Sequence, residues 1–306
     1  MPPAVGCHPD SVEAMSEPLD LRTTLGAAPI QRDVVRVHGP DAVEYLQGQL
    51  SQDVAALGVD ESAPSLLLQP TGKVDAWLRV TRVGDDELLL DVDAGYGDAV
   101  HARLRRFKLR TEAELEPDRW SGLALRGPGA ADVDVPAGAL GLAAGWPGVS
   151  GIDLLSAGEL ALAGVPLVDR AALEALRIEC GVPAMGAELT EATIPAEAGQ
   201  WLIDASVSFA KGCYTGQELI ARIDSRGGNV PRPIRGLRID GDAVPAGADV
   251  VVEGAVVGAI TSSGRSPALG AIALAVVGRG IEVGAPIEVR WDGGTARGTL
   301  AALPLR

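Results

Sequence analysis

The segment KGCYTGQE contains the residues of the chain that are best placed for chemistry, because Cys213 lies there beside Lys211. Thr215 and Glu218 have the spacing of a capping box, in which a hydroxyl and a carboxylate accept free N–H groups where a helix begins. We therefore expect a helix that begins at Gly216. A thiol near a helix N-terminus and a lysine can have its pKa lowered from about 8.5 into the range of roughly 3.5 to 7.5. Cys213 is thus a candidate reactive thiolate, supported by Lys211.

Each residue of this segment also has a purely structural interpretation. A free cysteine is most often a small buried hydrophobic residue, and the spacing alone favours this for Cys213. Gly216 fits a turn, and Glu218 with Arg222 fits a surface ion pair one helical turn apart.

The bulk composition limits the classes of function. A chain of 306 residues with 47% hydrophobic content is long enough for two or three domains. Its net charge of -15 argues against a nucleic-acid-binding face. Cys7, Cys180 and Cys213 form no C-x-x-C pair, and so few cysteines are typical of a protein in a reducing compartment, the cytoplasm. The same spacing argues against a stable iron–sulfur cluster in the monomer. We expect residues 1–30 to form a loose tail that contains no signal peptide or membrane anchor. Met15 is a candidate for the first residue of the protein in the cell.

The first half of the chain is expected to form an α+β unit that helps to position these residues. RDVVRVHG alternates as a strand, and GPDAVEYLQGQLSQDV follows with helical periodicity. PSLLLQPTGKVDAWLRVTRVGDDELLLDVD contains three strand-like runs separated by turn residues, which predicts adjacent hairpins. A second helix, YGDAVHARLRRFKLR, then leads to a strand at TEAELEP. The pattern predicts an antiparallel sheet.

The second half of the chain adds further strands, a helix and a separate domain. SGLALRGP and GIDLLSAG are expected strands, and residues 130–149 are expected loops. DRAALEALRIECG predicts a helix that has Leu173 and Leu176 on its apolar side and ends at Gly181. From Arg232 onward, short Val, Ile and Leu runs alternate with glycine turns, which is typical of a small β-barrel. We therefore expect an α+β region over 31–231 and a barrel over 232–306.

KGCYTGQE resembles the signature of the YgfZ-type folate-binding proteins, which are relatives of the aminomethyltransferase (T-protein) of the glycine cleavage system. The resemblance extends to VHGPDAVEYLQGQLSQDV, LLLQPTGKVDAWLRV, LRIECGVPAMGAELTEATIPAEAG and GAVVGAITSSGRSPALGAIALAVV, and so covers the chain from about Asp33. It implies two α+β domains and a C-terminal β-barrel around a central cavity. It also implies binding of tetrahydrofolate or a derivative, and a supporting role in the assembly or repair of [4Fe-4S] proteins. The expected partners are folate and iron–sulfur client or assembly proteins, with no nucleic acid and no membrane.

The resemblance also suggests residues for folate binding. Glu197 lies in TIPAEAG, which resembles the T-protein segment whose glutamate contacts the pterin; the alternative is an exposed loop glutamate. Arg226 resembles the folate-contacting arginine, Arg222 or Arg232 could replace it, and Tyr214 is a further candidate contact. Arginines near a helix end can also simply stabilise its C-terminus. A second cationic candidate, usually a solvated helix face, is the run Arg103, Arg105, Arg106, Lys108 and Arg110.

The segment TGKVDAWL argues against aminomethyl transfer. The aminomethyltransferases have an acidic pair here, whereas this chain has Asp75 followed by Ala76. Alanine cannot move a proton, so we expect the ancestral reaction to be lost or changed. Two alternatives remain open: a folate-dependent aminomethyltransferase or other C1 transferase, and a folate-sensing module. A sensing module would need Glu197 but would tolerate Cys213→Ala.

Overall fold

The computed structural model describes residues 19–306, and its larger part is built on one antiparallel sheet of seven strands in the order β2-β3-β4-β1-β5-β7-β6. This sheet carries the α+β character that the sequence predicts. Its strands are β1 (Gly26–His38), β2 (Ser62–Leu68), β3 (Val74–Gly84), β4 (Glu87–Asp93), β5 (Glu114–Arg126), β6 (Leu140–Ala143) and β7 (Gly151–Ser156).

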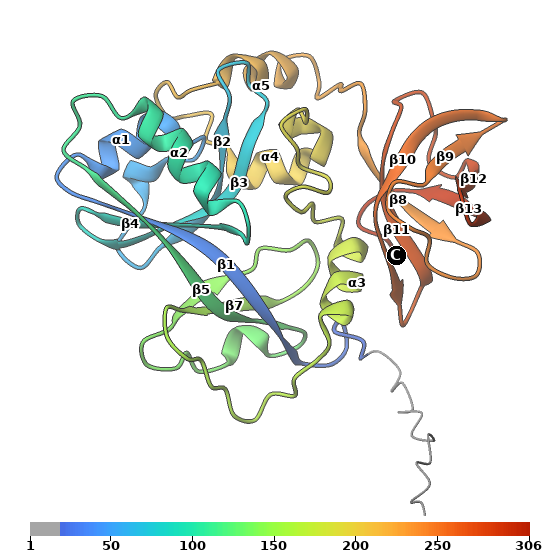
Figure 1. Cartoon of the computed structure of the whole chain (residues 1–306), viewed down its shortest axis with the longest axis horizontal. Helices are drawn as coiled ribbons and strands as arrows, with labels where there is room; N and C mark the ends of the chain where they lie inside the picture. The colour runs from blue at the N-terminus through green and yellow to red at the C-terminus, as the bar shows by residue number, and fades with distance from the viewer. Residues whose placement is uncertain (1–18) are drawn as a thin grey trace, which may run out of the picture.

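Two long strands, β1 and β5, lie at the centre of this sheet and join its two sides, β2-β3-β4 and β7-β6 (Figure 1). β1 and β5 pair along their whole length of 13 residues, from Gly26 opposite Arg126 to His38 opposite Glu114. The expectation of two separate strands at TEAELEP and SGLALRGP was wrong, because both lie in β5. At Pro117 the strand pairs only with β1, since β7 pairs from Ser121 onward, and a proline without an N–H is tolerated where one edge is free.

Two helices cover one face of the sheet and enclose a hydrophobic core. α1 (Ala42–Gln49) and α2 (Gly97–Phe107) pack on β1, β3 and β4, with a short 3₁₀ helix at Val54–Ala56. Leu46, Leu90 and Leu104, from α1, β4 and α2, are fully buried in this core.

The third helix, α3 (Arg170–Cys180), confirms the sequence-based prediction and lies between the sheet and the barrel (Figure 1). It begins where Asp169 accepts the N–H of Ala171 at 3.0 Å, and it ends at Gly181, whose φ of 71° is left-handed. It is followed by a 3₁₀ turn (Pro195–Ala198), α4 (Gln200–Ser206) and α5 (Gln217–Asp224).

The C-terminal domain is a closed six-stranded barrel in the order β10-β11-β8-β13-β12-β9. The expected combination of α+β region and barrel is thereby confirmed. The barrel strands are β8 (Ile234–Ile239), β9 (Asp249–Val252), β10 (Ala255–Ser266), β11 (Gly270–Val277), β12 (Pro286–Trp291) and β13 (Gly294–Ala301).

Two boundary expectations change. The tail is shorter than residues 1–30, because Leu21 is buried against α3 and β1 begins at Gly26. Residues 130–149 include a 3₁₀ turn (Ala130–Asp132) and the edge strand β6, which pairs with β7. Cys7 and Met15 lie outside the described residues. Within residues 19–306, no helix is both long and apolar enough to cross a membrane.

Candidate functional site

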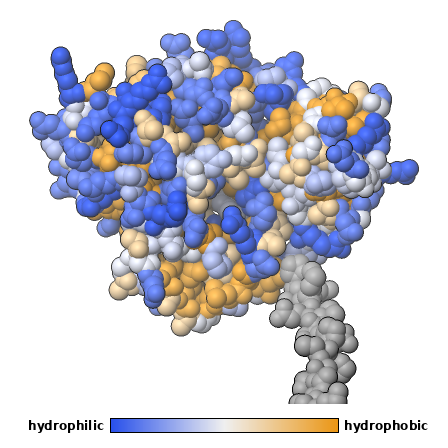
Figure 2. All heavy atoms as spheres, viewed as in Figure 1, coloured by the Kyte–Doolittle hydropathy of each residue, from blue (hydrophilic) through white to orange (hydrophobic). Residues whose placement is uncertain are grey.

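A cavity of about 520 Å³ lies over the sheet, between α3, the loop that follows α3 and α4. This volume is within the usual range for small-molecule sites, roughly 300–1,000 Å³. The middle of the molecular face shown in Figure 2 is hollowed, with polar and apolar side chains mixed around the hollow. The charged and aromatic side chains that line the cavity are Arg32, Arg79, Asp93, Arg126, Asp153, Arg170, Glu174, Arg177, Tyr96, Trp77, Trp146 and Trp201.

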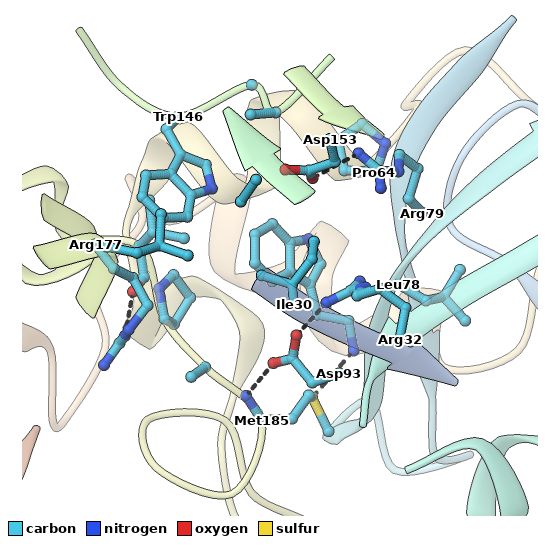
Figure 3. Close-up of a pocket in the computed structure, with 18 of the residues that line it drawn as sticks. Ile30, Arg32, Pro64, Leu78, Arg79, Asp93, Trp146, Asp153, Arg177 and Met185 are labelled. Atoms are coloured by element: carbon cyan, nitrogen blue, oxygen red, sulfur yellow. Dashed lines mark hydrogen bonds and ion pairs between the residues drawn. The ribbon is translucent and has the colours of Figure 1, made fainter. Parts of the chain in front are cut away.

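The floor of the cavity is a ladder of arginines and aspartates from neighbouring strands (Figure 3). Arg79 of β3 lies 3.1 Å from Asp153 of β7, and Arg126 of β5 lies 2.9 Å from the other oxygen of Asp153. Arg32 of β1 pairs with Asp93 of β4. These charges lie on five adjacent strands; Arg79, Arg126 and Asp153 are largely buried, whereas Arg32 and Asp93 are partly exposed. Each buried charge has an oppositely charged partner, which offsets the cost of its burial.

Two atoms of this ladder have no hydrogen-bond partner among the described residues. They are Oδ1 of Asp153 and Nε of Arg126, both buried. Arg126 Nη1 is close enough to Oδ1 for an ion pair, but its N–H groups are not directed at that oxygen. Burial alone would raise the pKa of Asp153, but Arg126, then Arg79 and Arg32, hold it below its usual value of 3.8, so the carboxylate is ionised at neutral pH. A buried acceptor and a buried donor that form no hydrogen bond within the chain can form one with a ligand or water of the opposite pattern.

Tryptophans form the apolar walls of the cavity. Trp77 and Trp201 meet edge to face, with ring centroids 6.0 Å apart, and the guanidinium of Arg126 lies 4.2 Å from the ring of Trp146. Trp77 is fixed in place by its Nε1–H, which donates to Ser206 Oγ at 3.0 Å. Flat walls beside a polar floor suit a planar aromatic ligand with a hydrogen-bonding edge.

The cysteine motif lies elsewhere. Cys213 is exposed, so the buried interpretation of this thiol does not hold, but it does not line the cavity. The expected capping box was also wrong: α5 begins at Gln217, Gly216 is its N-cap with φ of 83°, and no side chain caps this end. Instead, Gln217 Oε1 accepts the N–H of Tyr214 at 3.2 Å. The left-handed glycine turns the chain before the helix, so Thr215 is not at the capping position.

Lys211 has a structural environment. Its Nζ donates to the carbonyl oxygens of Gln47, Leu50 and Gln52 at 2.6, 2.6 and 2.9 Å, at the C-terminal end of α1. A cation is favourable there, because the last carbonyls of a helix carry partial negative charge. All three N–H bonds of the ammonium are therefore used in holding the motif against α1, and the catalytic role expected for Lys211 receives no support from its contacts.

The other predicted residues are also outside the cavity. Glu197 is buried; its Oε2 accepts the N–H of Ile194 at 3.0 Å, and its Oε1 has no hydrogen-bond partner within the described chain, although Arg232 Nε is 3.7 Å away. Tyr214 is half-buried, with its ring 5.1 Å from Lys211 Nζ. Arg222 and Arg226 are exposed on and after α5. The structure thus groups Lys211, Cys213 and Tyr214, but separates them from the cavity.

Asp75 occupies a β-bulge. Leu67 pairs with Ala76 and Leu68 pairs with Val74, so Asp75 is the extra residue of β3. Its carboxylate accepts from Arg103 Nε at 2.9 Å, so Arg103 is not part of a purely solvated helix face. Burial raises the pKa of Asp75, and Arg103 opposes this. Ala76 is fully buried in the core, and Asp75 does not line the cavity.

The sequence did give a signal for the cavity residues that were missed. Arg79, Asp93, Arg126 and Asp153 each interrupt or end an apolar strand, as in AWLRV, LLLDVD, LALR and GIDLL. A charge within a strand that is otherwise buried must have a partner or a ligand. Because the partners are on different strands, only the sheet order brings them together. No cluster of metal-ligating side chains occurs in the part of the chain described, residues 19–306.

Comparison with known proteins places these features in a family. Residues 232–305 match the glycine cleavage T-protein C-terminal barrel domain. An aminomethyltransferase of Thermus thermophilus is 32% identical over 301 residues, covering 88% of this chain and 83% of that protein. The tRNA-modifying protein YgfZ of Pectobacterium carotovorum is 29% identical over 214 residues, covering 62% of this chain and 63% of that protein.

A solved structure gives the same result for the fold. The glycine cleavage system aminomethyltransferase T of Bartonella henselae superposes with a TM-score of 0.75 at 23% identity, covering 93% of this chain and 87% of that chain. The sequence resemblance is therefore confirmed at the level of the wider family, in which aminomethyltransferases match more of this chain than YgfZ does. The chain belongs to the glycine cleavage T-protein (aminomethyltransferase) family.

Proposed function

We propose that the protein binds a reduced folate in the cavity over the sheet. Members of the T-protein family use tetrahydrofolate. The observation that carries the proposal is a buried pair of atoms that form no hydrogen bond, Asp153 Oδ1 and Arg126 Nε, at the floor of a cavity walled by tryptophans. Asp153 Oδ1 also forms an ion pair with Arg126 Nη1. A pterin edge has both N–H donors and acceptors, and so complements this pair.

The residues of this chain would bind and orient the folate. Asp153 would accept ring N–H groups, and Arg126 would donate to a ring acceptor. Trp77 and Trp146 would exclude water from the ring faces. A bound reduced folate supplies or accepts one-carbon units. The cavity therefore supports a site for a one-carbon carrier.

The relatives favour a folate-dependent one-carbon transferase as the activity. They therefore favour an aminomethyltransferase or other C1 transferase, the alternative that the sequence left open, over an accessory role. Within this class, Ala76 and the pairing of Asp75 with Arg103 argue against efficient aminomethyl transfer, because the remaining carboxylate already has a cationic partner.

A role in the assembly or repair of [4Fe-4S] proteins remains the second candidate, and one observation favours it. The Cys213 thiol is exposed within the motif that resembles the YgfZ signature, so a client protein could reach it. This candidate does not require the thiol to face the folate. The Cys213 sulfur could attack a client disulfide, with one client sulfur leaving as a thiolate and a mixed disulfide formed with the other, or it could ligate metal transiently.

Calorimetry with tetrahydrofolate tests the binding site. Loss of one charged hydrogen-bonding partner costs about 1.5–3 kcal/mol, so Asp153→Asn should weaken binding about 10- to 100-fold. Glu197→Gln is the comparison, because Glu197 is a predicted folate ligand that lies outside the cavity. Thermal melting of both variants checks the fold. Unchanged affinity in a folded Asp153→Asn variant, with lost affinity in Glu197→Gln, would move the site to Glu197.

Two activity assays separate the candidate functions. Turnover with an aminomethylated carrier protein and tetrahydrofolate measures C1 transfer, and complementation measures the activity of [4Fe-4S] enzymes in cells. Cys213→Ala should leave folate affinity unchanged in either case. Loss of complementation in this variant favours the accessory role, whereas turnover comparable with that of a T-protein favours the transferase.

A further inference from the structure

Asp91 lies on the same face of the sheet as the charged ladder, but it does not itself line the cavity. It belongs to β4 and is 3% exposed. In the sheet, Asp91 pairs directly with Arg79 of β3 and with Val34 of β1, and Arg32 is two residues from Val34. Residues opposite each other or two apart share a face, so the Asp91 carboxylate lies between two arginines that line the cavity.

The Asp91 carboxylate accepts three hydrogen bonds from these two arginines. Arg79 donates from Nε to Oδ2 at 2.9 Å and from Nη2 to Oδ1 at 3.1 Å. Arg32 donates from Nε to Oδ1 at 2.9 Å. The two bonds from Arg79 form a bidentate pair, which fixes the plane and the direction of a guanidinium. The orientation of Arg79 is therefore set by Asp91.

This orientation decides how Arg79 meets Asp153. The remaining nitrogen of Arg79, Nη1, donates to the carbonyl oxygen of Ala143 and to Oδ2 of Asp153, each at 3.1 Å. The other oxygen of Asp153, Oδ1, is 2.9 Å from Arg126 Nη1 in an ion pair but forms no hydrogen bond with residues 19–306. Arg79 thus binds one oxygen of Asp153 and leaves the other available.

Loss of the Asp91 charge would change this arrangement. The buried Nε and Nη2 groups of Arg79 would lose their acceptors, and buried donors without acceptors are unfavourable. The other carboxylate in contact with this guanidinium is that of Asp153. We therefore expect Arg79 to turn toward Asp153 and to bind both of its oxygens.

We propose that Asp91 is a positioning residue, which holds Arg79 so that Asp153 Oδ1 stays free to accept an N–H from the cavity ligand. This inference rests on the proposed function. It makes Asp91 a determinant of specificity, because a ligand with an N–H donor gains a charge-assisted hydrogen bond only while this oxygen is free. In a reduced folate, the 2-amino group of the ring is such a donor.

Calorimetry with two probes tests this role: tetrahydrofolate, and its 2-desamino analogue, in which hydrogen replaces the amino group. Wild type should prefer tetrahydrofolate by about tenfold or more, because the analogue lacks a donor for a charged acceptor. In Asp91→Asn the preference should fall to within about twofold, since Arg79 then occupies Asp153. Asp33→Asn is the matched control and should keep the wild-type preference, because Asp33 is also buried and paired with an arginine, Arg119, but lies outside the cavity.

A double variant shows whether Asp91 acts through Arg79. Asp91→Asn combined with Arg79→Met leaves no guanidinium at this position to occupy Asp153, so the preference for tetrahydrofolate should return to about the wild-type value. Replacement of both members of a buried ion pair is also better tolerated than loss of one, so the double variant should fold even if Asp91→Asn alone does not. Thermal melting checks the fold of each variant.

The outcomes separate this inference from the proposed function. An unchanged preference in a folded Asp91→Asn variant, with or without an equal loss of affinity for both probes, would overturn the role of Asp91 alone. A preference that stays lost in the folded double variant would also overturn it, because Asp91 would not act through Arg79. If wild type binds both probes equally, folate binds without an N–H donated to Asp153, and again only this inference fails. If wild type binds neither probe, the proposed function fails as well.

Discussion

Two residues of one motif, Lys211 and Cys213, have different surroundings in the structure. The Lys211 ammonium is half-buried and donates to three carbonyl oxygens, whereas the Cys213 side chain is exposed. The buried thiol of Cys180 offers a contrast, because burial raises its pKa to about 11 and keeps it protonated at neutral pH. Proximity in sequence therefore suggested one chemical unit where the structure shows an anchor and a free thiol.

Lys211→Met should destabilise the fold, and Cys213→Ala should not. The first variant leaves partly buried carbonyls of Gln47, Leu50 and Gln52 without a donor, which should lower the free energy of unfolding by about 2 kcal/mol or more. The second removes only exposed atoms, so a change below about 0.5 kcal/mol is expected. Urea unfolding measures both.

The pH dependence provides a second readout for Lys211. Burial lowers the pKa of Lys211 to about 8 from its ordinary 10.5. The unfolded chain then binds more protons than the folded one between these values, so this group's contribution to stability rises with pH through that window. The stability gap between wild type and Lys211→Met should be larger at pH 9.5 than at pH 7. A gap that is absent at both pH values would show that Lys211 is not an anchor.

At the scale of elements, the turn before α5 is packed against the β2–β3 turn. Gly216 has φ of 83°, and a Cβ there would lie 2.5 Å from the carbonyl oxygen of Gln69 and 2.8 Å from Leu68 Cβ. Gly241, in a barrel turn, has a similar φ of 90° but nothing within 4 Å of an added Cβ. The two glycines therefore share the conformational penalty and differ only in packing.

Gly216→Ala should be more destabilising than Gly241→Ala. Both substitutions introduce a Cβ at positive φ, which costs about 1–2 kcal/mol. Only Gly216→Ala also forces apart the motif turn and the β2–β3 turn, which should add about 1–3 kcal/mol. Denaturant unfolding of the two variants measures the difference. Equal destabilisation would mean that the motif turn is free to move away from the sheet.

The sequence was sufficient for elements whose signals are local. The helix α3 could be predicted because Asp169, the apolar periodicity and Gly181 all agree on its bounds. The start of α5 could not, because a T-x-x-E spacing fits a capping box equally well when a left-handed glycine displaces the helix by one residue. Local patterns are ambiguous where one backbone angle decides the geometry.

The cavity required information that is not local. Asp153 and Arg126 lie on β7 and β5, and their role follows from pairing in the sheet rather than from spacing in the chain. The family resemblance predicted a central cavity, but the site residues that it suggested were Glu197 and those of the cysteine motif, which do not line the cavity. The charges within apolar strands were the physical signal for the cavity, since buried charges need partners.

At the scale of the whole molecule, a buried network connects α3 to the barrel. Glu188 is 1% exposed and accepts from Arg177 Nη1 at 3.0 Å and from Ser262 Oγ of β10 at 2.7 Å. Arg177 also donates to Ser262 Oγ at 2.6 Å. Because Arg177 also lines the cavity, this network connects the barrel to the cavity wall by direct hydrogen bonds.

Glu188→Gln should destabilise the molecule more than Ser262→Ala does. The first leaves part of the buried charge of Arg177 uncompensated, which should cost about 3 kcal/mol. The second removes one hydroxyl and should cost about 1 kcal/mol. Thermal melting gives the order of the two variants. A Glu188→Gln variant that melts with wild type would show that the network does not hold the barrel in place.

The most direct test of the central claim is a crystal structure of the protein with tetrahydrofolate bound. Our account predicts density for the pterin in the cavity, with ring nitrogens within hydrogen-bonding distance of Asp153 Oδ1 and with Trp77 and Trp146 beside the ring. A pterin bound at Glu197 or at the Cys213 motif, with the cavity filled only by solvent, would contradict the account.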